Sequence, residues 1–221
     1  MITEIRKSID IEEGKLPLLP LSHFRTIGPR VTQQDRYCLF QTKALLSAED
    51  MKDLFKSMAE ATKDFTGGTT ANLAGVSARR IIAGNVGDSM TTLFTRAAGK
   101  PLNGKRLNKL HTFRPPDEID RILKLETATL FAAGDHITNL THRVSMTRRL
   151  GNDEFSPMVT STPSIHDYTF DPGNCEFAQL CLYTDGITDV SGHKHDDLAF
   201  EVQHLASLLE QDMDQNPKRP F

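Results

Sequence analysis

The chain has 221 residues, of which 38% are hydrophobic and 25% charged, a composition typical of one globular domain with a sizeable core. Its 26 basic and 29 acidic side chains give a net charge of −3, which argues against binding to nucleic acid or to an anionic membrane. No apolar run has the length of a bilayer span, and the N-terminal residues lack the apolar core of a signal peptide.

The cysteines support a location in a reducing compartment. Cys38, Cys175 and Cys181 are three in number and have no zinc-ligand spacing. They predict reduced and mostly buried thiols, and therefore a cytoplasmic protein. We also expect a monomer.

The N-terminal part of the chain divides into an arm, a strand-like segment and a helix. Residues 1–22, with the Pro-punctuated LPLLPL, predict an N-terminal arm ahead of a domain over 23–210. The segment 24–40 is strand-like but is broken at Gly28-Pro29. From Ser47 the hydrophobic residues recur at helical spacing, and Ser47 with Asp50 fits a capping box. We expect this helix to end by Gly67-Gly68.

The rest of the chain is rich in short strands. The runs TTANLAGV and RRIIAGNV are separated only by Ser77-Ala78 and predict a hairpin, and the turn GNVGDS leads to a third strand, MTTLFT. Pro115-Pro116 opens a short helix. Further strand-like runs are TLFAA, SIHDYTF, EFAQLCLYT and DLAFEVQHL, followed by a flexible tail over 211–221. Together they predict an α+β protein, a β-sandwich of antiparallel strands flanked by helices.

The stretch YTDGITDV carries the strongest chemical signal. The apolar run 177–183 ends at Asp185-Gly186, which is the pattern of a buried strand that stops at a tight turn. A carboxylate there is costly to bury unless a cation or a donor meets it, and this favours a hard metal ion with oxygen ligands. An ordinary Asp-Gly turn is the alternative, since such turns are common.

Further acids lie at the ends of predicted strands, where side chains of a sandwich converge at one rim. Carboxylates that meet there repel one another unless divalent cations neutralise them. Arg30 is suited to hold a phosphate beside such cations, whereas the adjacent Arg148-Arg149 is interpreted as a solvated pair. The acids are Asp35, Asp88, Asp185, Asp189 and Asp196. The alternative is that they are turn residues on a domain of other purpose.

Seven segments of the chain resemble, in order, the motifs of the PPM-type, metal-dependent Ser/Thr protein phosphatases, also called type 2C phosphatases. They are GPRVTQQD, FTGGTTANLAGV, IIAGNVGDSMTTLF, RPPDEIDRI, RVSMTRRLGND, LCLYTDGITDV and HDDLAFEV, which lie between roughly residues 22 and 204. IIAGNVGDSMTTLF is similar to the family's strand–Gly-Asp-Ser–strand hairpin, and RPPDEIDRI to its Glu-x-x-Arg-Ile helix start. LCLYTDGITDV is the closest match.

The resemblance implies a phosphoprotein phosphatase with one or two Mg²⁺ or Mn²⁺ ions at one edge of the sandwich, whose metal-activated water attacks phosphorus directly. Asp35, Asp185 and Asp196 would be metal ligands. Asp189 and Asp88 would hold metal-bound water or an additional ion, and Gly186 would let the backbone approach that water. Arg30 would bind the substrate phosphate, so Arg30, Asp35 and Asp185 are the predicted catalytic residues.

The chain departs from the family at one motif. The Asp-Gly-His-Gly-Gly or Asp-Gly-Met-Gly-Gly segment, whose Asp bridges the two metals, is absent. Two hypotheses follow. The first is a phosphatase of weak activity, in which His193 or His195 takes the place of a lost ligand or acid. The second is an inactive pseudophosphatase that serves as a protein-binding module.

Overall fold

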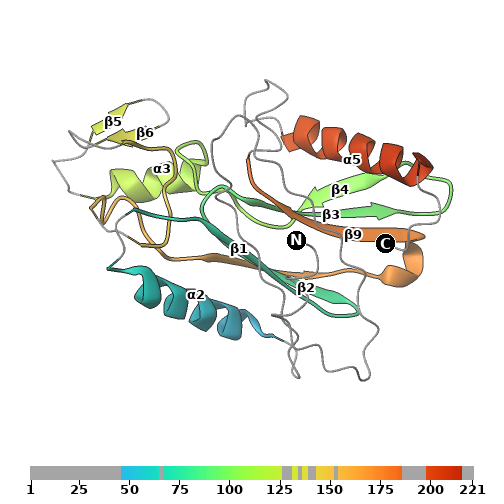
Figure 1. Cartoon of the computed structure of the whole chain (residues 1–221), viewed down its shortest axis with the longest axis horizontal. Coiled ribbons are helices and arrows are strands. Elements are labelled where there is room, and N and C mark those ends of the chain that lie inside the picture. Colours follow the sequence, from blue (N-terminus) through green and yellow to red (C-terminus); the bar gives the residue numbers. More distant parts are fainter. Residues whose placement is uncertain are drawn as a thin grey trace, which may run out of the picture.

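The computed structural model describes the chain in seven stretches: 46–64, 67–125, 131–133, 136–138, 143–151, 154–185 and 198–215. Two three-stranded antiparallel sheets form its centre, and each carries a helix on its outer face (Figure 1). The order of strands is β1-β2-β8 in the first sheet and β4-β3-β9 in the second. This confirms the α+β class predicted from the sequence.

The elements that build these layers have the following bounds. The first sheet consists of β1 (Ala71–Val76), β2 (Arg80–Val86) and β8 (Ser164–Thr169), and helix α2 (Ala48–Thr62) covers it. The second sheet consists of β3 (Met90–Arg96), β4 (Asn103–Arg106) and β9 (Phe177–Tyr183), and helix α5 (Leu198–Gln215) covers it.

The two sheets pack face to face through alternate residues of their strands. Ile81 of β2 and Leu93 of β3 are buried in one cluster. Their neighbours Ile82 and Phe94 lie in the clusters under α2 and α5, because successive side chains of a strand point to opposite faces. The inner cluster also includes Ala83, Leu107, Tyr168, Phe170 and Leu180. The described layers are therefore helix, sheet, sheet and helix, as the sandwich prediction required.

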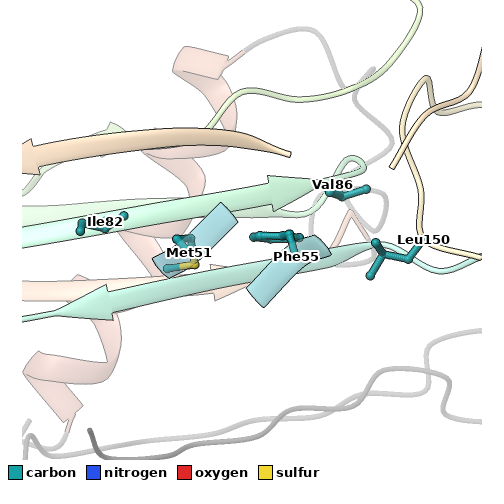
Figure 2. Packing of buried hydrophobic residues seen from close by; sticks show 5 residues of the cluster. All are labelled: Met51, Phe55, Ile82, Val86 and Leu150. Atoms are coloured by element: carbon teal, nitrogen blue, oxygen red, sulfur yellow. The ribbon is translucent and has the colours of Figure 1, made fainter. Parts of the chain in front are cut away.

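Helix α2 begins where the sequence predicts. Ser47 is its N-cap, and the Ser47 side chain accepts from the backbone N–H of Asp50 at 3.0 Å while the Asp50 carboxylate accepts from the Ser47 N–H at 2.7 Å. Met51 and Phe55, one turn apart, are buried against the first sheet. Figure 2 shows them packed with Ile82, Val86 and Leu150.

Helix α5 corrects one sequence prediction. The run DLAFEVQHL was interpreted as a strand, but from Leu198 onward it is the first half of an 18-residue helix. Its partly buried residues Val202, Leu205 and Leu209 pack against Phe94 of β3, and their spacing of three and four is helical. Val202 and Leu205 lie within the run, and Leu209, which completes the helical spacing, lies beyond it. The helix also extends to Gln215, into the range predicted as a tail.

The Gly-Asp-Ser turn corrects a second prediction. The resemblance implied a hairpin of the two strands around it, yet β2 pairs with β1 and β8, while β3 pairs with β4 and β9. The turn at 87–89 therefore carries the chain from the first sheet to the second. The other predicted hairpin, β1 with β2, is confirmed.

A short helix and a small third sheet lie at one end of the sandwich (Figure 1). Helix α3 (Pro116–Leu123) begins after Pro115, as the sequence predicts. The strands β5 (Phe131–Ala133), β6 (His136–Thr138) and β7 (Arg143–Val144) form a small antiparallel sheet. A short 3-10 helix, η2 (Pro172–Asn174), precedes β9. The domain boundaries drawn from the sequence remain a prediction.

Candidate active site at one end of the second sheet

Two of the predicted site residues lie at the same end of the second sheet. In the antiparallel pair β3–β9, Met90 is the partner of Tyr183. Asp88 lies two residues before Met90, and Asp185 lies two residues after Tyr183. Both acids are partly buried. The register of this strand pair thus brings together two carboxylates that are almost a hundred positions apart in the sequence.

The turn that carries Asp88 has a backbone that only glycine adopts without strain. Gly87 has a φ of 115°, in the left-handed region. A Cβ at Gly87 would also lie 2.3 Å from the Cγ2 of Thr70, so the side chain of Thr70 packs directly on the turn. The Thr70 hydroxyl lies 3.3 Å from that of Ser89. These contacts leave the turn little freedom to change shape.

Two buried asparagines hold the turn by its carbonyl groups. Asn85, with no exposed surface, donates from Nδ2 to the carbonyl of Gly87 at 2.8 Å and to that of Lys109 at 2.9 Å. Asn108 donates to the carbonyl of Ser89 at 2.8 Å, and its Oδ1 accepts from the N–H of Thr91 at 2.7 Å. Asn72 of β1 adds a bond to the carbonyl of Met90 at 2.7 Å.

A buried histidine, His111, also holds this turn by hydrogen bonds. The backbone N–H of His111 donates to the carbonyl of Gly87 at 3.0 Å, and the N–H of Gly87 donates to the Nδ1 of His111 at 3.1 Å. His111 has no exposed surface. Burial first, and then the positive charge of Arg148, lowers the pKa of His111 from 6.5 to about 3, so the ring is neutral at physiological pH.

Behind His111 lies a second buried cluster, around Glu118 of α3. Glu118 is 1% exposed, and its carboxylate accepts from the guanidinium of Arg148 and, at 2.7 Å, from the hydroxyl of Thr147. Arg121 and Lys109 lie at 3.4 Å from it. Burial raises the pKa of Glu118, but the hydrogen bonds from Arg148 and Thr147 outweigh burial, so the net pKa lies well below its ordinary value.

This cluster was missed by sequence reasoning and corrects a third prediction. Arg148 and Arg149 were interpreted as a solvated pair. Instead, the Arg148 side chain is 14% exposed and bound to Glu118. The Arg149 side chain is 10% exposed, and its guanidinium lies over the ring of Phe155 at 5.0 Å. The available signal was that Glu118 and Arg148 fall in two segments, RPPDEIDRI and RVSMTRRLGND, that resemble the same family.

The other predicted site residues lie outside the described residues. They are Arg30, Asp35, Gly186, Asp189 and Asp196, together with His193 and His195. Their roles remain predictions.

The described acids are compatible with a divalent cation but do not form a whole site. Within the described stretches, no group of three or more His, Cys, Asp or Glu side chains is arranged to hold a metal ion. Asp88 and Asp185 offer carboxylate oxygens, the donors that Mg²⁺ and Mn²⁺ prefer. Their shared position fits part of such a site, and further ligands would have to come from residues outside the described stretches.

Comparison with known proteins identifies the family. The family model of protein phosphatase 2C matches residues 31–196, about three quarters of the chain. The chain therefore belongs to the protein phosphatase 2C family, as its motifs predicted, and this family is generally Mn²⁺- or Mg²⁺-dependent.

Two curated relatives are plant proteins. Protein phosphatase 2C 3 of Arabidopsis thaliana is 30% identical over 123 residues, which are 56% of this chain and 25% of the relative. Probable protein phosphatase 2C 30 of Oryza sativa subsp. japonica is 29% identical over 123 residues, which are 56% of this chain and 28% of the relative. The matched part of the chain thus spans about a quarter of the length of these relatives.

The fold also resembles a solved structure. The structure of a C. elegans sex determining protein matches 68% of this chain and 36% of its own chain, with a TM-score of 0.52 and 18% identity. At this identity the likeness concerns the fold alone. Among the described helices, none is both long and apolar enough to cross a membrane.

Proposed function

We propose that this chain is a metal-dependent phosphoprotein phosphatase that hydrolyses phosphomonoesters of Ser and Thr, with weak activity. Membership of the protein phosphatase 2C family supports the class of reaction. The observation that carries the proposal is the placement of Asp88 and Asp185 at one end of the β3–β9 pair. The proposal includes a cytoplasmic location, a monomeric state and a phosphoprotein as substrate.

The chain's own residues would act by binding and orientation. Asp88 and Asp185, with Asp35, Asp189 and Asp196, would hold one or two Mg²⁺ or Mn²⁺ ions through oxygen ligands. Such an ion, when bound, lowers the pKa of a coordinated water towards neutrality and so supplies a nucleophile. The missing side chain at Gly186 would leave room for that water, and Arg30 would orient the phosphate by paired hydrogen bonds.

The hydrogen bonds around Gly87 suit a role of Asp88 as a metal ligand. A ligand that binds a cation tightly must already stand in place, because reorganisation of a flexible turn would oppose binding. Here the turn is fixed because Asn85 and Asn108 donate to its carbonyl groups and His111 accepts from the N–H of Gly87, and all three side chains are buried. A plain surface turn has no need of three buried polar side chains, which are costly to desolvate.

A second candidate is a pseudophosphatase that keeps the fold as a protein-binding module without turnover. One observation favours it: the sequence lacks the Asp-Gly-His-Gly-Gly or Asp-Gly-Met-Gly-Gly segment of the family. Without the carboxylate of that segment, two adjacent cations would lose a shared anion and repel one another more strongly.

One experiment separates the two candidates. The full chain is titrated with Mn²⁺ and with Mg²⁺, and hydrolysis of p-nitrophenyl phosphate is followed for the wild type and for Asp185→Asn. A rate that appears with metal and vanishes in Asp185→Asn supports the enzyme. Metal binding without turnover supports the pseudophosphatase. If neither ion binds and thermal stability does not change on addition of metal, the proposed metal site fails for the phosphatase and for the pseudophosphatase alike.

A further inference from the structure

His111 and Gly87 form a reciprocal pair of hydrogen bonds, although 24 positions separate them in the sequence. One bond is between backbones, from the N–H of His111 to the carbonyl of Gly87 at 3.0 Å. The other runs in the opposite direction, from the N–H of Gly87 to the imidazole Nδ1 at 3.1 Å. Gly87 directly precedes Asp88. The imidazole thus holds the peptide group next to the candidate ligand.

The direction of the second bond sets the state of the ring. A nitrogen that accepts a hydrogen bond carries no proton, so a neutral His111 has its proton on Nε2. Burial favours this neutral form, and so do the nearby cations Arg148, Lys109 and Arg121, whereas Glu118 opposes it. Loss of the acceptor would leave the N–H of Gly87 buried and without its bond to Nδ1.

The backbone of His111 is held on its carbonyl side as well. The carbonyl of His111 accepts from the N–H of Thr147 at 2.7 Å, and the Thr147 hydroxyl donates to the carboxylate of Glu118 at 2.7 Å. A chain of bonds therefore runs from the Glu118 cluster through Thr147 and His111 to Gly87. With both of its neighbours fixed, His111 can act as a rigid support for the turn.

We propose that His111 is a positioning residue for Asp88: by accepting the N–H of Gly87 it fixes the turn that aims the Asp88 carboxylate at a divalent cation. The inference rests on the proposed function, because it needs a cation at this end of the sheet. His111 itself binds no metal in this role, since its Nδ1 is occupied by Gly87 and its side chain is wholly buried. Partners that orient a ligand from behind commonly change metal affinity by about 10- to 100-fold.

The test uses three substitutions of His111 in the full chain. His111→Asn keeps an acceptor at the position of Nδ1, since both atoms are bonded to Cγ. His111→Leu places a carbon there and removes the acceptor at similar volume. His111→Gln moves the amide one bond farther from the backbone, and it replaces the Leu variant in the comparison if that variant does not fold. Met158→Ala, in the separate buried cluster with Phe155 and Val159, controls for loss of stability alone.

Two quantities are measured for each variant. The dissociation constant for Mn²⁺ is obtained from the electron paramagnetic resonance signal of the free ion, and the exchange rate of the Gly87 amide is measured in metal-free protein. For His111→Leu we expect Mn²⁺ binding about tenfold weaker or more, and faster exchange at Gly87. His111→Asn should bind within about threefold of the wild type, and Met158→Ala should lower the melting temperature without changing the dissociation constant.

The outcomes separate this inference from the function on which it rests. If the wild type binds Mn²⁺ and His111→Leu, or His111→Gln in its place, binds it equally well, the positioning role is overturned and the proposed function stands. If Met158→Ala weakens binding as much as His111→Leu, the effect is one of stability, and the positioning role is again overturned. If the wild type binds no Mn²⁺, the proposed metal site fails, and the inference falls with it.

Discussion

Asp88 and Asp185 extend from the same end of the β3–β9 pair, each two residues beyond the paired residues Met90 and Tyr183. The position of both acids follows from strand register. The hydroxyls of Thr92 and Tyr183 lie 3.0 Å apart within this pair and are buried, so the register is supported by a side-chain contact as well as by the ladder. A shift of the β3–β9 register by one residue would change the position of Asp88 relative to Asp185.

Replacement of either acid should weaken metal binding. We expect Asp88→Asn and Asp185→Asn each to weaken Mn²⁺ binding by about tenfold or more, because an amide offers a neutral and weaker oxygen donor in place of a carboxylate. Isothermal titration of the full chain measures the effect. Asp53→Asn, on the exposed side of α2, removes the same charge elsewhere and should leave the affinity unchanged. Equal affinities for Asp53→Asn and Asp185→Asn would contradict the prediction.

Loss of the charge on Glu118 should destabilise the fold. Glu118→Gln leaves the guanidinium of Arg148, together with Arg121 and Lys109, without the carboxylate they surround. Breaking a buried ion pair on one side commonly costs about 3 kcal/mol or more, and in a chain of this size that lowers the melting temperature by roughly 6–12 °C. Urea unfolding measures the change in the free energy of unfolding.

The matched control for Glu118 is its neighbour on the same helix. Asp117 pairs with Lys109 too, but its side chain is 69% exposed. Exposed ion pairs contribute little, so Asp117→Asn should change stability by less than about 1 kcal/mol. A similar loss in both variants would show that the burial of Glu118 is not what makes it important.

Local sequence signals predicted the elements, but not their long-range partners. The capping box of Ser47 and Asp50 and the apolar stripe of α2 act within a few residues, so the helix was found with the right start. Helix α5 was mistaken for a strand because the run DLAFEVQHL includes Val202 and Leu205 but not Leu209, which extends the helical spacing by another turn.

The candidate site was predictable only in part, because local sequence signals do not reveal long-range contacts. Asp88 and Asp185 were singled out because an acid after an apolar run is visible locally, and their role as ligands stays a prediction. The bonds of His111 to Gly87 and of Glu118 to Arg148 join residues 24 and 30 positions apart, and no local pattern marks them. A buried Glu in a helix start also looks like an ordinary exposed first-turn acid, which the helix dipole favours.

The packing of α2 on the first sheet should depend on glycine at position 84, which has no side chain. A Cβ at Gly84 would lie 2.5 Å from Cε2 of Phe55 and 2.9 Å from Cγ of Met51, closer than packed atoms approach. Gly84→Ala should therefore destabilise the protein by about 1–3 kcal/mol through overpacking. Gly173→Ala, whose Cβ would meet only an atom of Asp171 at 3.4 Å, is the control and should be nearly neutral.

A double variant checks the cause of that loss. Gly84→Ala combined with Phe55→Leu shortens the ring that the new methyl group would strike. If the clash is the cause, thermal unfolding should give a double variant more stable than the sum of the two single losses predicts. Strict additivity would mean that Gly84→Ala acts through some effect other than contact with Phe55.

Stability should fall in mild acid because of His111. A group whose pKa is lower in the folded protein than in the unfolded chain binds fewer protons when folded, so acid favours unfolding. The pKa of His111 falls from 6.5 to about 3 on folding, and its stabilising contribution is therefore lost progressively below about pH 7. Between about pH 7.5 and pH 5.5 this amounts to ~1.4 kcal/mol. The lowered pKa of Glu118 adds a further loss only at more acidic pH.

The comparison that isolates this effect is between the wild type and His111→Asn, which cannot take up the proton. Urea unfolding at a series of pH values should give a flatter profile for the variant, by the amount expected from one histidine. His166, whose pKa is also lowered by burial and by Lys109, titrates in both proteins and cancels in the difference. Parallel profiles would mean that folding does not lower the pKa of His111, and then its Nδ1 could not remain the acceptor of the Gly87 N–H in mild acid.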